Sequence, residues 1–248
     1  MPRLTYHAAS QIERAIPTAR FQTYRQATGD VVEAARLYLW NIQAASAVTE
    51  LTGLAEVLLR ETIDSCLRGW NASVGGSEEW ITHPAPTVLK HLVRPDVPES
   101  WRPRQDGDLY PRWWEKKARD NYDPRRPGAE STARTLPTHD DLVASLSFGS
   151  WTSILPTPQA GRNNNRVKIW DTALASGFTG VRREAVYRYA HELRWMRNRA
   201  AHLRPMLNTD DLWTTHRYAI RMLRSMDTDF AQIIAGQATL PTIIKIKP

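Results

Sequence analysis

Residues 31–67 read VVEAARLYLWNIQAASAVTELTGLAEVLLRETIDSCL, a run that contains no proline. Its apolar residues recur every three or four positions, so they fall on one face of a helix about 55 Å long. Asp30 precedes the run as an N-cap, and Glu33 stands three residues later in the position of a capping box. A break near Gly53 or at Ala44–Ala45 would divide the run, so the sequence predicts one long kinked helix or two helices in line.

Helical spacing returns in the last third of the chain. The predicted helices are bounded by capping residues, glycine or proline, and they cover Thr138–Ser147, Asn163–Ser176, Val181–Leu203 and Asn208–Ala235. Residues 84–137 contain nine prolines and are expected to form a loop-rich insert. The tail, which contains LPTIIKIKP, is expected to be a short edge strand or disordered.

These patterns predict a single domain over residues 1–248 with an all-α fold, a helical bundle that carries a proline-rich insert. Its expected parts are N-terminal helices (1–83), the insert (84–137), C-terminal helices (138–235) and the tail (236–248). Asn41 lies inside the first long helix, although asparagine is a poor helix former. We therefore expect its side chain to bond to a buried partner.

The composition points to a reducing compartment. Cys66 is the one cysteine, so no disulfide can form within the chain. The first residues, MPRLTYHAAS, lack the apolar region of a signal peptide, and no uninterrupted apolar run reaches the length of a membrane span. The expected location is the cytoplasm, with no membrane contact.

Positive charge is concentrated in one part of the sequence. Between Ala160 and Pro205, ten Arg and Lys residues face three acidic residues, an excess of seven that equals the formal net charge of the whole chain, +7. A basic stretch of this kind suits an anionic partner such as RNA or DNA. In the insert, Trp113 and Trp114 also stand among basic residues, where they could stack on bases. We favour the alternative that they anchor the insert to the core.

Residues 194–205, RWMRNRAAHLRP, hold the densest group of polar and cationic side chains. On a helix, Arg194, Asn198 and His202 are spaced by four and share one face, which His191 begins. Arg197 lies about 140° round the helix from His202, but its long side chain can reach that face. The apolar side consists of Leu193, Met196, Ala200 and Leu203.

These residue types suit the cleavage of RNA. The ribose 2′-hydroxyl is the nucleophile, histidine can move its proton near neutral pH, and arginine can bind two phosphate oxygens. Asparagine can orient either group, and no metal is required. The spacing alone permits this interpretation without selecting it, because a solvated helix face would look the same and chance produces roughly one Arg-x4-His pair in such a chain.

The string RNRAAH resembles the R-N-x-x-x-H signature of HEPN-domain ribonucleases, and RNRAAHLRP resembles the R-N-R-x-A-H-H-E-P form of bacterial Abi-like (abortive infection) proteins. Three further segments resemble that family in the same order: YRQATGDVVEAARLYLWNIQAASA, LAEVLLRETI and THDDLVASLSFGSWTSIL. The resemblance covers roughly residues 20–235. It implies a HEPN-like helical bundle, metal-independent endoribonuclease activity, and a role in phage defence or as the toxin of a toxin–antitoxin pair.

The resemblance also implies roles for residues. Arg197, Asn198 and His202 would be catalytic. The residues expected to bind RNA or to support the site are Arg194, Arg199, Arg204, His191, Glu56 and Arg60. Glu56 and Arg60, one turn apart, would pair and brace the motif helix, although a plain surface pair is the alternative.

Two positions depart from the family pattern. Leu203 stands where the family has a second histidine, and Arg204 stands where it has glutamate. These departures favour an alternative, a non-catalytic HEPN module that binds structured RNA. A DNA-binding helical regulator ranks last, because no helix-turn-helix pattern is present.

The expected partners are RNA, a second copy of the chain in a homodimer, and an antitoxin or a noncoding RNA as regulator. No cofactor and no metal are expected, because the sequence has no Gly-rich phosphate loop, CxxC or HExxH.

Overall fold

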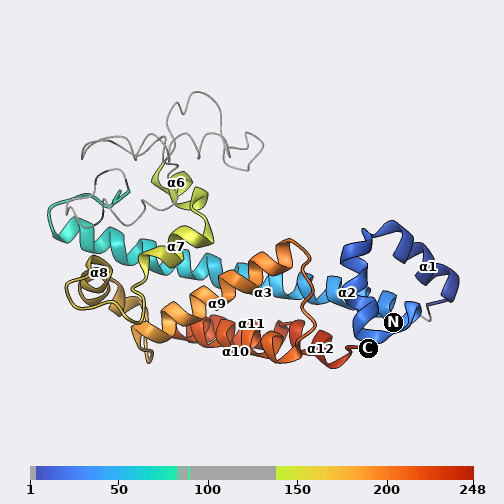
Figure 1. Cartoon of the computed structure of the whole chain (residues 1–248). Coiled ribbons are helices and arrows are strands. Elements are labelled where there is room, and N and C mark those ends of the chain that lie inside the picture. The colour runs from blue at the N-terminus through green and yellow to red at the C-terminus, as the bar shows by residue number, and fades with distance from the viewer. Residues whose placement is uncertain (1–3, 82, 84–88, 90–137) are drawn as a thin grey trace, which may run out of the picture. The chain divides into compact units, whose positions relative to one another are not determined.

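The computed structural model describes residues 4–81, 83, 89 and 138–248, and every regular element in them is a helix (Figure 1). The α-helices are α1 Tyr6–Ala15, α2 Thr18–Thr28, α3 Val31–Ser73, α6 His139–Ser145, α7 Phe148–Ile154, α8 Asn165–Thr172, α9 Arg183–Ala201, α10 Thr209–Met226, α11 Thr228–Gln237 and α12 Leu240–Lys245. A short 3-10 helix, η3, covers Leu174–Gly177. The prediction of an all-α fold is confirmed for this part of the chain.

The chain packs as two compact units. Unit 1 comprises Met1–Ala55 and His191–Pro248, and unit 2 comprises Glu56–Ala190. The predicted single domain over 1–248 stays a prediction. The predicted insert at 84–137, with Trp113 and Trp114, lies outside the described residues apart from Leu89.

The predicted long helix is one continuous element, α3, of 43 residues. Gly29, with φ 75°, ends α2 in the left-handed conformation that glycine adopts without strain. The Asp30 carboxylate then accepts the backbone N–H groups of Val32 and Glu33 at 2.8 and 3.0 Å. Glu33 binds Arg36 at 2.7 Å, so the N-cap forms as predicted while the glutamate pairs along the helix.

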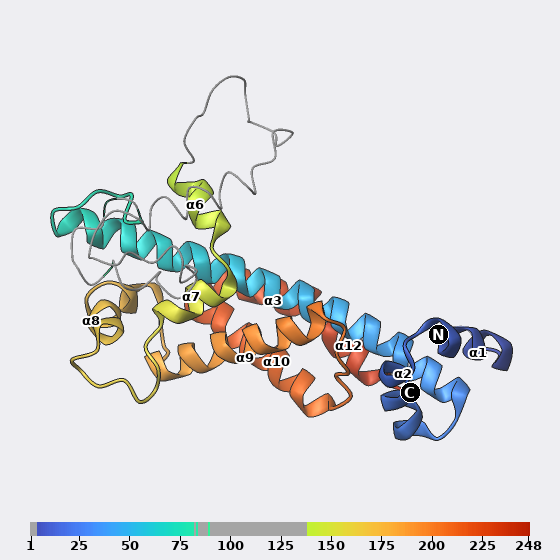
Figure 2. The same cartoon turned by 45° about the horizontal axis from the view of Figure 1, so that its top comes forward.

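The core of unit 1 forms around the first half of α3. Phe21 and Tyr24 of α2 make edge contacts with Tyr38, and all three side chains are buried. Both views place the end of α12 near α2 (Figures 1 and 2). The fully buried Trp40 donates its indole N–H to the backbone oxygen of Ile243 at 2.7 Å, which ties α12 to α3.

Two predictions about the C-terminal part of the chain were wrong. The expected single helix over Asn208–Ala235 is two helices, because Asp227 has extended backbone and caps α11 by accepting the N–H of Phe230 at 2.8 Å. The tail is neither a strand nor disordered. It forms α12, with a proline in its first turn and with Leu240 and Ile244 buried.

Unit 2 has its own apolar core. Its largest buried side chains in the described residues include Trp80, Trp151 and Leu142. Thr138 and Ser147 begin α6 and α7 with complete capping boxes. The predicted helix over Asn163–Ser176 is divided into α8 and the short η3.

One described helix, α3, is long and apolar enough to cross a membrane when judged by length and composition alone. The mean hydropathy of its most apolar 18-residue window is 1.2, and 44% of that window is buried inside the protein. A core helix passes the same test, so this observation is weak evidence for a membrane span.

Candidate functional site

The last turns of α9 have one buried and one exposed side. Leu193, Met196 and Ala200 are buried, as the apolar spacing predicts, whereas Leu203, also predicted on that side, is half-buried and lies beyond the end of α9. On the other side the exposed residues include His191, Arg194, Arg197, Asn198 and His202. The predicted polar face is therefore open to solvent and within reach of a large ligand.

His202 occupies the position where α9 ends. Its backbone N–H donates to the oxygen of Asn198 at 3.3 Å, and the next residue, Leu203, turns left-handed with φ 47°. The N–H groups of Leu203 and Arg204 then donate to the oxygens of Ala200 and Arg199, both at 2.9 Å. This bond pattern is a Schellman C-cap, in which glycine usually takes the left-handed position. His202 therefore lies on a tightly defined turn.

Asn41 of α3 holds the chain just after this turn. Its side chain is fully buried, accepts the N–H of Met206 at 2.7 Å, and donates to the oxygen of Arg204 at 3.5 Å. The prediction that Asn41 has a buried partner is confirmed. An asparagine in the middle of a helix thus positions residues 204–206.

Arg199 and Lys247 bind the same segment from other directions. The Arg199 guanidinium donates to the oxygen of Pro205 and lies 4.9 Å from the ring centre of Trp195, which is 45% exposed. The ammonium of Lys247 donates to the oxygen of Leu207 at 2.7 Å. Arg199, predicted to support RNA binding, is thus engaged in holding the turn.

Sequence reasoning missed Lys247 at this site, and it also missed Arg20 of α2. Its Nη2 donates to the backbone oxygen of His202 at 3.1 Å across 182 residues of sequence. No spacing rule connects two positions so far apart, so the sequence holds no signal that would have identified this contact.

The exposed arginines near the turn form no ion pair with an acid in the described residues. In the described part of the chain, Arg194, Arg197 and Arg204 are exposed and none forms an ion pair with a carboxylate. Within the same residues, no group of three or more His, Cys, Asp or Glu side chains is placed to hold a metal ion. The site is therefore suited to an anion.

The remaining predicted residues, Glu56 and Arg60, are half-buried on α3 and belong to unit 2, whereas the motif end of α9 belongs to unit 1. Their predicted role as a brace for the motif helix stays a prediction.

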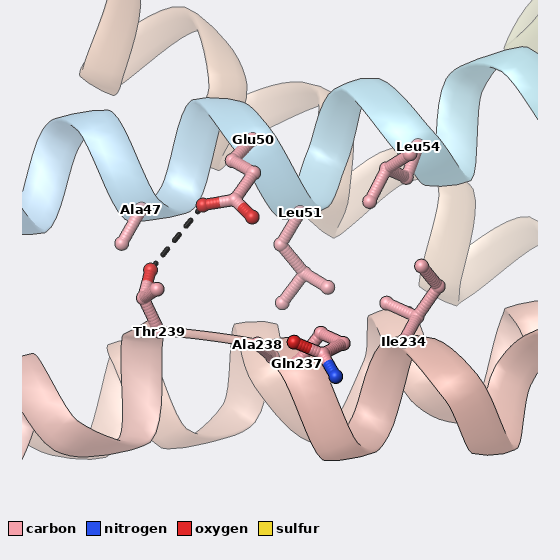
Figure 3. A pocket seen from close by; sticks show the side chains of 8 residues that line it. All are labelled: Ala47, Glu50, Leu51, Leu54, Ile234, Gln237, Ala238 and Thr239. Atoms are coloured by element: carbon pink, nitrogen blue, oxygen red, sulfur yellow. Dashed lines mark hydrogen bonds between the residues drawn. The ribbon is translucent and has the colours of Figure 1, made fainter.

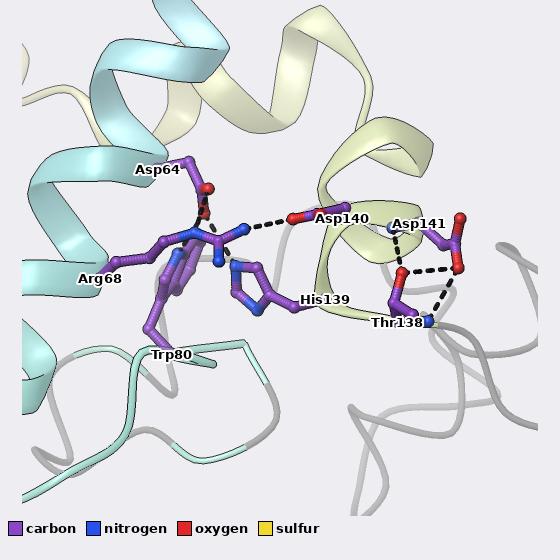
Figure 4. Close-up of polar contacts among 7 residues, drawn as sticks. All are labelled: Asp64, Arg68, Trp80, Thr138, His139, Asp140 and Asp141. Carbon is purple, nitrogen blue, oxygen red and sulfur yellow. Dashed lines mark hydrogen bonds and ion pairs between the residues drawn. The ribbon is translucent and has the colours of Figure 1, made fainter. Parts of the chain in front are cut away.

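Unit 2 holds a second polar cluster, which the sequence did not predict (Figure 4). Asp64, 4% exposed, accepts hydrogen bonds from Trp80 Nε1 at 2.7 Å and from Arg68 Nε at 2.6 Å. His139 Nε2 lies 2.9 Å from the same carboxylate, and Arg68 also binds Asp140. Burial raises the pKa of Asp64, but the hydrogen bonds from His139, Arg68 and Trp80 outweigh it and hold that pKa below its usual value.

In the described residues, only one of the two ring nitrogens of His139 forms a hydrogen bond. Its ring is buried against Trp80, with ring centres 6.0 Å apart. The ionised Asp64 can only accept, so Nε2 of His139 carries the proton between them. Its other ring nitrogen, Nδ1, is buried and has no hydrogen-bond partner among the described residues. This cluster joins segments on either side of residues 90–137 to α3.

A shallow groove in unit 1 is a poor candidate for an anion site (Figure 3). It lies between α3 and the segment that joins α11 to α12, and it is lined by Ala47, Glu50, Leu51, Leu54, Ile234, Gln237, Ala238 and Thr239. Thr239 donates to Glu50 at 3.3 Å. The lining contains no cation, so phosphate would meet only the charge of Glu50.

Comparison with known proteins gives no match: no family model, no curated protein and no solved structure matches this chain.

Proposed function

We propose that the exposed end of α9 binds RNA and cleaves it through attack of the ribose 2′-hydroxyl, without a metal. One observation carries this proposal: His202 is exposed on a turn whose backbone is held by Asn41, Arg20 and Arg199. A proton-transfer group needs a fixed position next to its substrate, and such a turn supplies it.

Each residue has a distinct role in this mechanism. His202 takes the proton of the 2′-hydroxyl, whose oxygen bonds to the adjacent phosphorus as the 5′-oxygen of the next nucleotide leaves. The leaving 5′-oxygen takes up a proton from water or from the protonated His202, so the products are a 2′,3′-cyclic phosphate and a 5′-hydroxyl. Arg197 stabilises charge on the phosphoryl oxygens, and Asn198, one turn before His202, orients the histidine or the phosphate.

The wider context belongs to the same proposal and rests on the resemblance of RNRAAH to the HEPN motif. We propose a HEPN-like bundle that acts in the cytoplasm as a homodimer, in phage defence or as a toxin. An antitoxin or a noncoding RNA would restrain it. The two motif helices of a dimer would then contribute to one active site.

The first experiment is a cleavage assay on total RNA in excess EDTA. Wild-type protein is compared with His202→Ala, Arg197→Ala and the control His7→Ala, which removes an exposed histidine from α1. Wild type and His7→Ala should cut, leaving 2′,3′-cyclic phosphate ends, and the two motif variants should not. Cutting only with added metal, or equal cutting by His202→Ala, would reject the mechanism.

A non-catalytic RNA-binding module is the second candidate. Arg204 favours it, because an exposed cation stands where the family motif has an acid. In that case wild type and His202→Ala would both bind structured RNA in a salt-dependent manner and neither would cut. Equal affinity for duplex DNA and for RNA would instead indicate a DNA-binding protein.

A further inference from the structure

We infer that Arg20, on α2, binds a phosphate of the RNA backbone beside His202, so that the site is built from α2 as well as from α9. This inference rests on the proposed function and adds a binding residue that the motif does not contain. Its basis is the hydrogen bond of 3.1 Å from Arg20 Nη2 to the backbone oxygen of His202.

The contact leaves most of the guanidinium available. An arginine side chain carries five N–H donors, and in the described structure one hydrogen bond of Arg20 is formed. The residue is exposed, and no carboxylate among the described residues pairs with it. A planar fork with free donors at an exposed position is suited to two oxygens of one phosphate.

An ionisable group one turn away on the same helix does not neutralise this charge. Tyr24, one turn after Arg20, interacts with it electrostatically. Burial raises the pKa of Tyr24 to about 12, with a further contribution from Tyr38, so the phenol stays neutral near pH 7. The helix α2 therefore places no negative charge next to Arg20 near pH 7.

The position of Arg20 also fits the chemistry. Arg194 and Arg197 precede His202 along α9, whereas Arg20 reaches the turn from another helix and Arg204 follows two residues later. A cation from α2 thus joins those that stand before and after His202 in the sequence. A single-stranded RNA backbone, with one charge on each nucleotide, can be held at the scissile phosphate and at a neighbouring one.

The test uses a 12-nucleotide RNA in which every 2′-hydroxyl is methylated, so the probe can bind but cannot be cut. Its affinity for the full chain is measured over a range of salt concentrations for wild type, Arg20→Ala, Arg20→Gln and Arg14→Ala. Arg14 is the matched control, an exposed arginine at the end of α1. Arg20→Gln removes the charge but keeps an amide donor for the His202 oxygen.

We expect both Arg20 variants to bind about tenfold more weakly than wild type. The slope of log affinity against log salt should fall in magnitude by about 0.7, the value for one lost contact with a single-stranded phosphate backbone. Arg14→Ala should keep the wild-type slope. Thermal unfolding of each variant shows whether a loss of binding reflects a loss of folded protein.

Several results would overturn the inference. An unchanged salt slope in Arg20→Ala would do so, and so would wild-type affinity in Arg20→Gln with weak binding in Arg20→Ala, because Arg20 would then only cap the turn. If the protein cleaves unmodified RNA but the Arg20 variants bind the probe as tightly as wild type, Arg20 is not a phosphate-binding residue and the proposed ribonuclease activity stands. If the Arg20 variants bind the probe more weakly but wild type does not cleave unmodified RNA, the role of Arg20 stands and the proposed catalytic step is rejected. Absence of binding by wild type would reject both.

Discussion

Asn41 accepts a hydrogen bond of 2.7 Å from the backbone N–H of Met206, although 165 residues separate them. Both residues are buried, so neither group can bond to water instead. The bond connects the first third of α3 to the segment that follows α9. The position of the turn at His202 therefore depends on a residue of α3 that lies outside the RNRAAH motif.

Replacement of Asn41 by alanine should destabilise the protein by about 1–3 kcal/mol, because the Met206 N–H would be left buried without an acceptor. The midpoint of urea unfolding measures this effect. Gln43→Ala is the control, since Gln43 is exposed on the same helix. A wild-type midpoint for Asn41→Ala would show that the bond does not contribute to stability.

Leu203 should tolerate glycine better than valine. Its left-handed backbone, with φ 47°, costs an L-residue roughly 1–2 kcal/mol, and a β-branched side chain fits it worst. Leu203→Gly should stay near wild-type stability, because relief of strain offsets the lost half-buried side chain. Leu203→Val should lose about 1 kcal/mol or more. If thermal unfolding ranks valine above glycine, burial outweighs backbone strain at this position.

Gly177 should not tolerate even a methyl group. A Cβ there would lie 2.7 Å from Cγ2 of Thr62 and 2.8 Å from Sγ of Cys66. Gly177→Ala should therefore destabilise the protein by about 1–3 kcal/mol through overpacking. At Gly69 a Cβ meets nothing within 4 Å, so Gly69→Ala in α3 should raise stability by about 0.5–1 kcal/mol. If Gly177→Ala and Gly69→Ala shift the midpoint of urea unfolding in the same direction, the close packing at Gly177 is contradicted.

Asp64→Asn should be among the most destabilising single changes in unit 2. An amide at this position would direct an N–H group at one of the donors that the carboxylate now accepts. The expected loss is about 3–5 kcal/mol, as for other broken buried ion pairs. Asp140→Asn also removes a contact with Arg68, but Asp140 is 79% exposed, so its loss should stay below about 1 kcal/mol. Similar midpoints of urea unfolding for Asp64→Asn and Asp140→Asn would contradict the expectation that the buried Asp64 cluster stabilises unit 2.

The contribution of Asp64 to the free energy of unfolding should disappear in acid. Its folded-state pKa lies below the ordinary value of 3.8, so its ionised form stabilises the protein above that pH. This stability is lost as the pH falls through the folded-state pKa. The difference in unfolding free energy between wild type and Asp64→Asn should therefore be largest near neutral pH and shrink below about pH 4. A difference that grows in acid would contradict this assignment.

Local patterns in the sequence identified much of the fold. The apolar spacing of residues 31–67, the cap at Asp30 and the buried side of α9 depend on neighbours within a few residues, and the structure has them as predicted. The division at Asp227 and the helix α12 were missed. Asp227 ends one helix and begins the next within a single residue, and α12 depends on packing against Trp40 of α3.

The candidate site was predictable only in part. The exposed face with Asn198 and His202 follows from helical spacing, and the role of Asn41 was suggested by a poor helix former inside a helix. Arg20 was not predictable, since its contact with His202 arises only when the chain folds. For the same reason, nothing in the sequence brings Asp64, Trp80 and His139 together.

The Asp64 cluster has a consequence for how this chain can change in length. Trp80 and His139 stand far apart in the sequence and both contact one carboxylate on α3, so these two contacts close the chain between them. The entropy of closing a loop grows only with the logarithm of its length, about 0.6 kcal/mol for each doubling. A change in the number of residues between Trp80 and His139 should therefore cost little closure entropy as long as both contacts with Asp64 are kept.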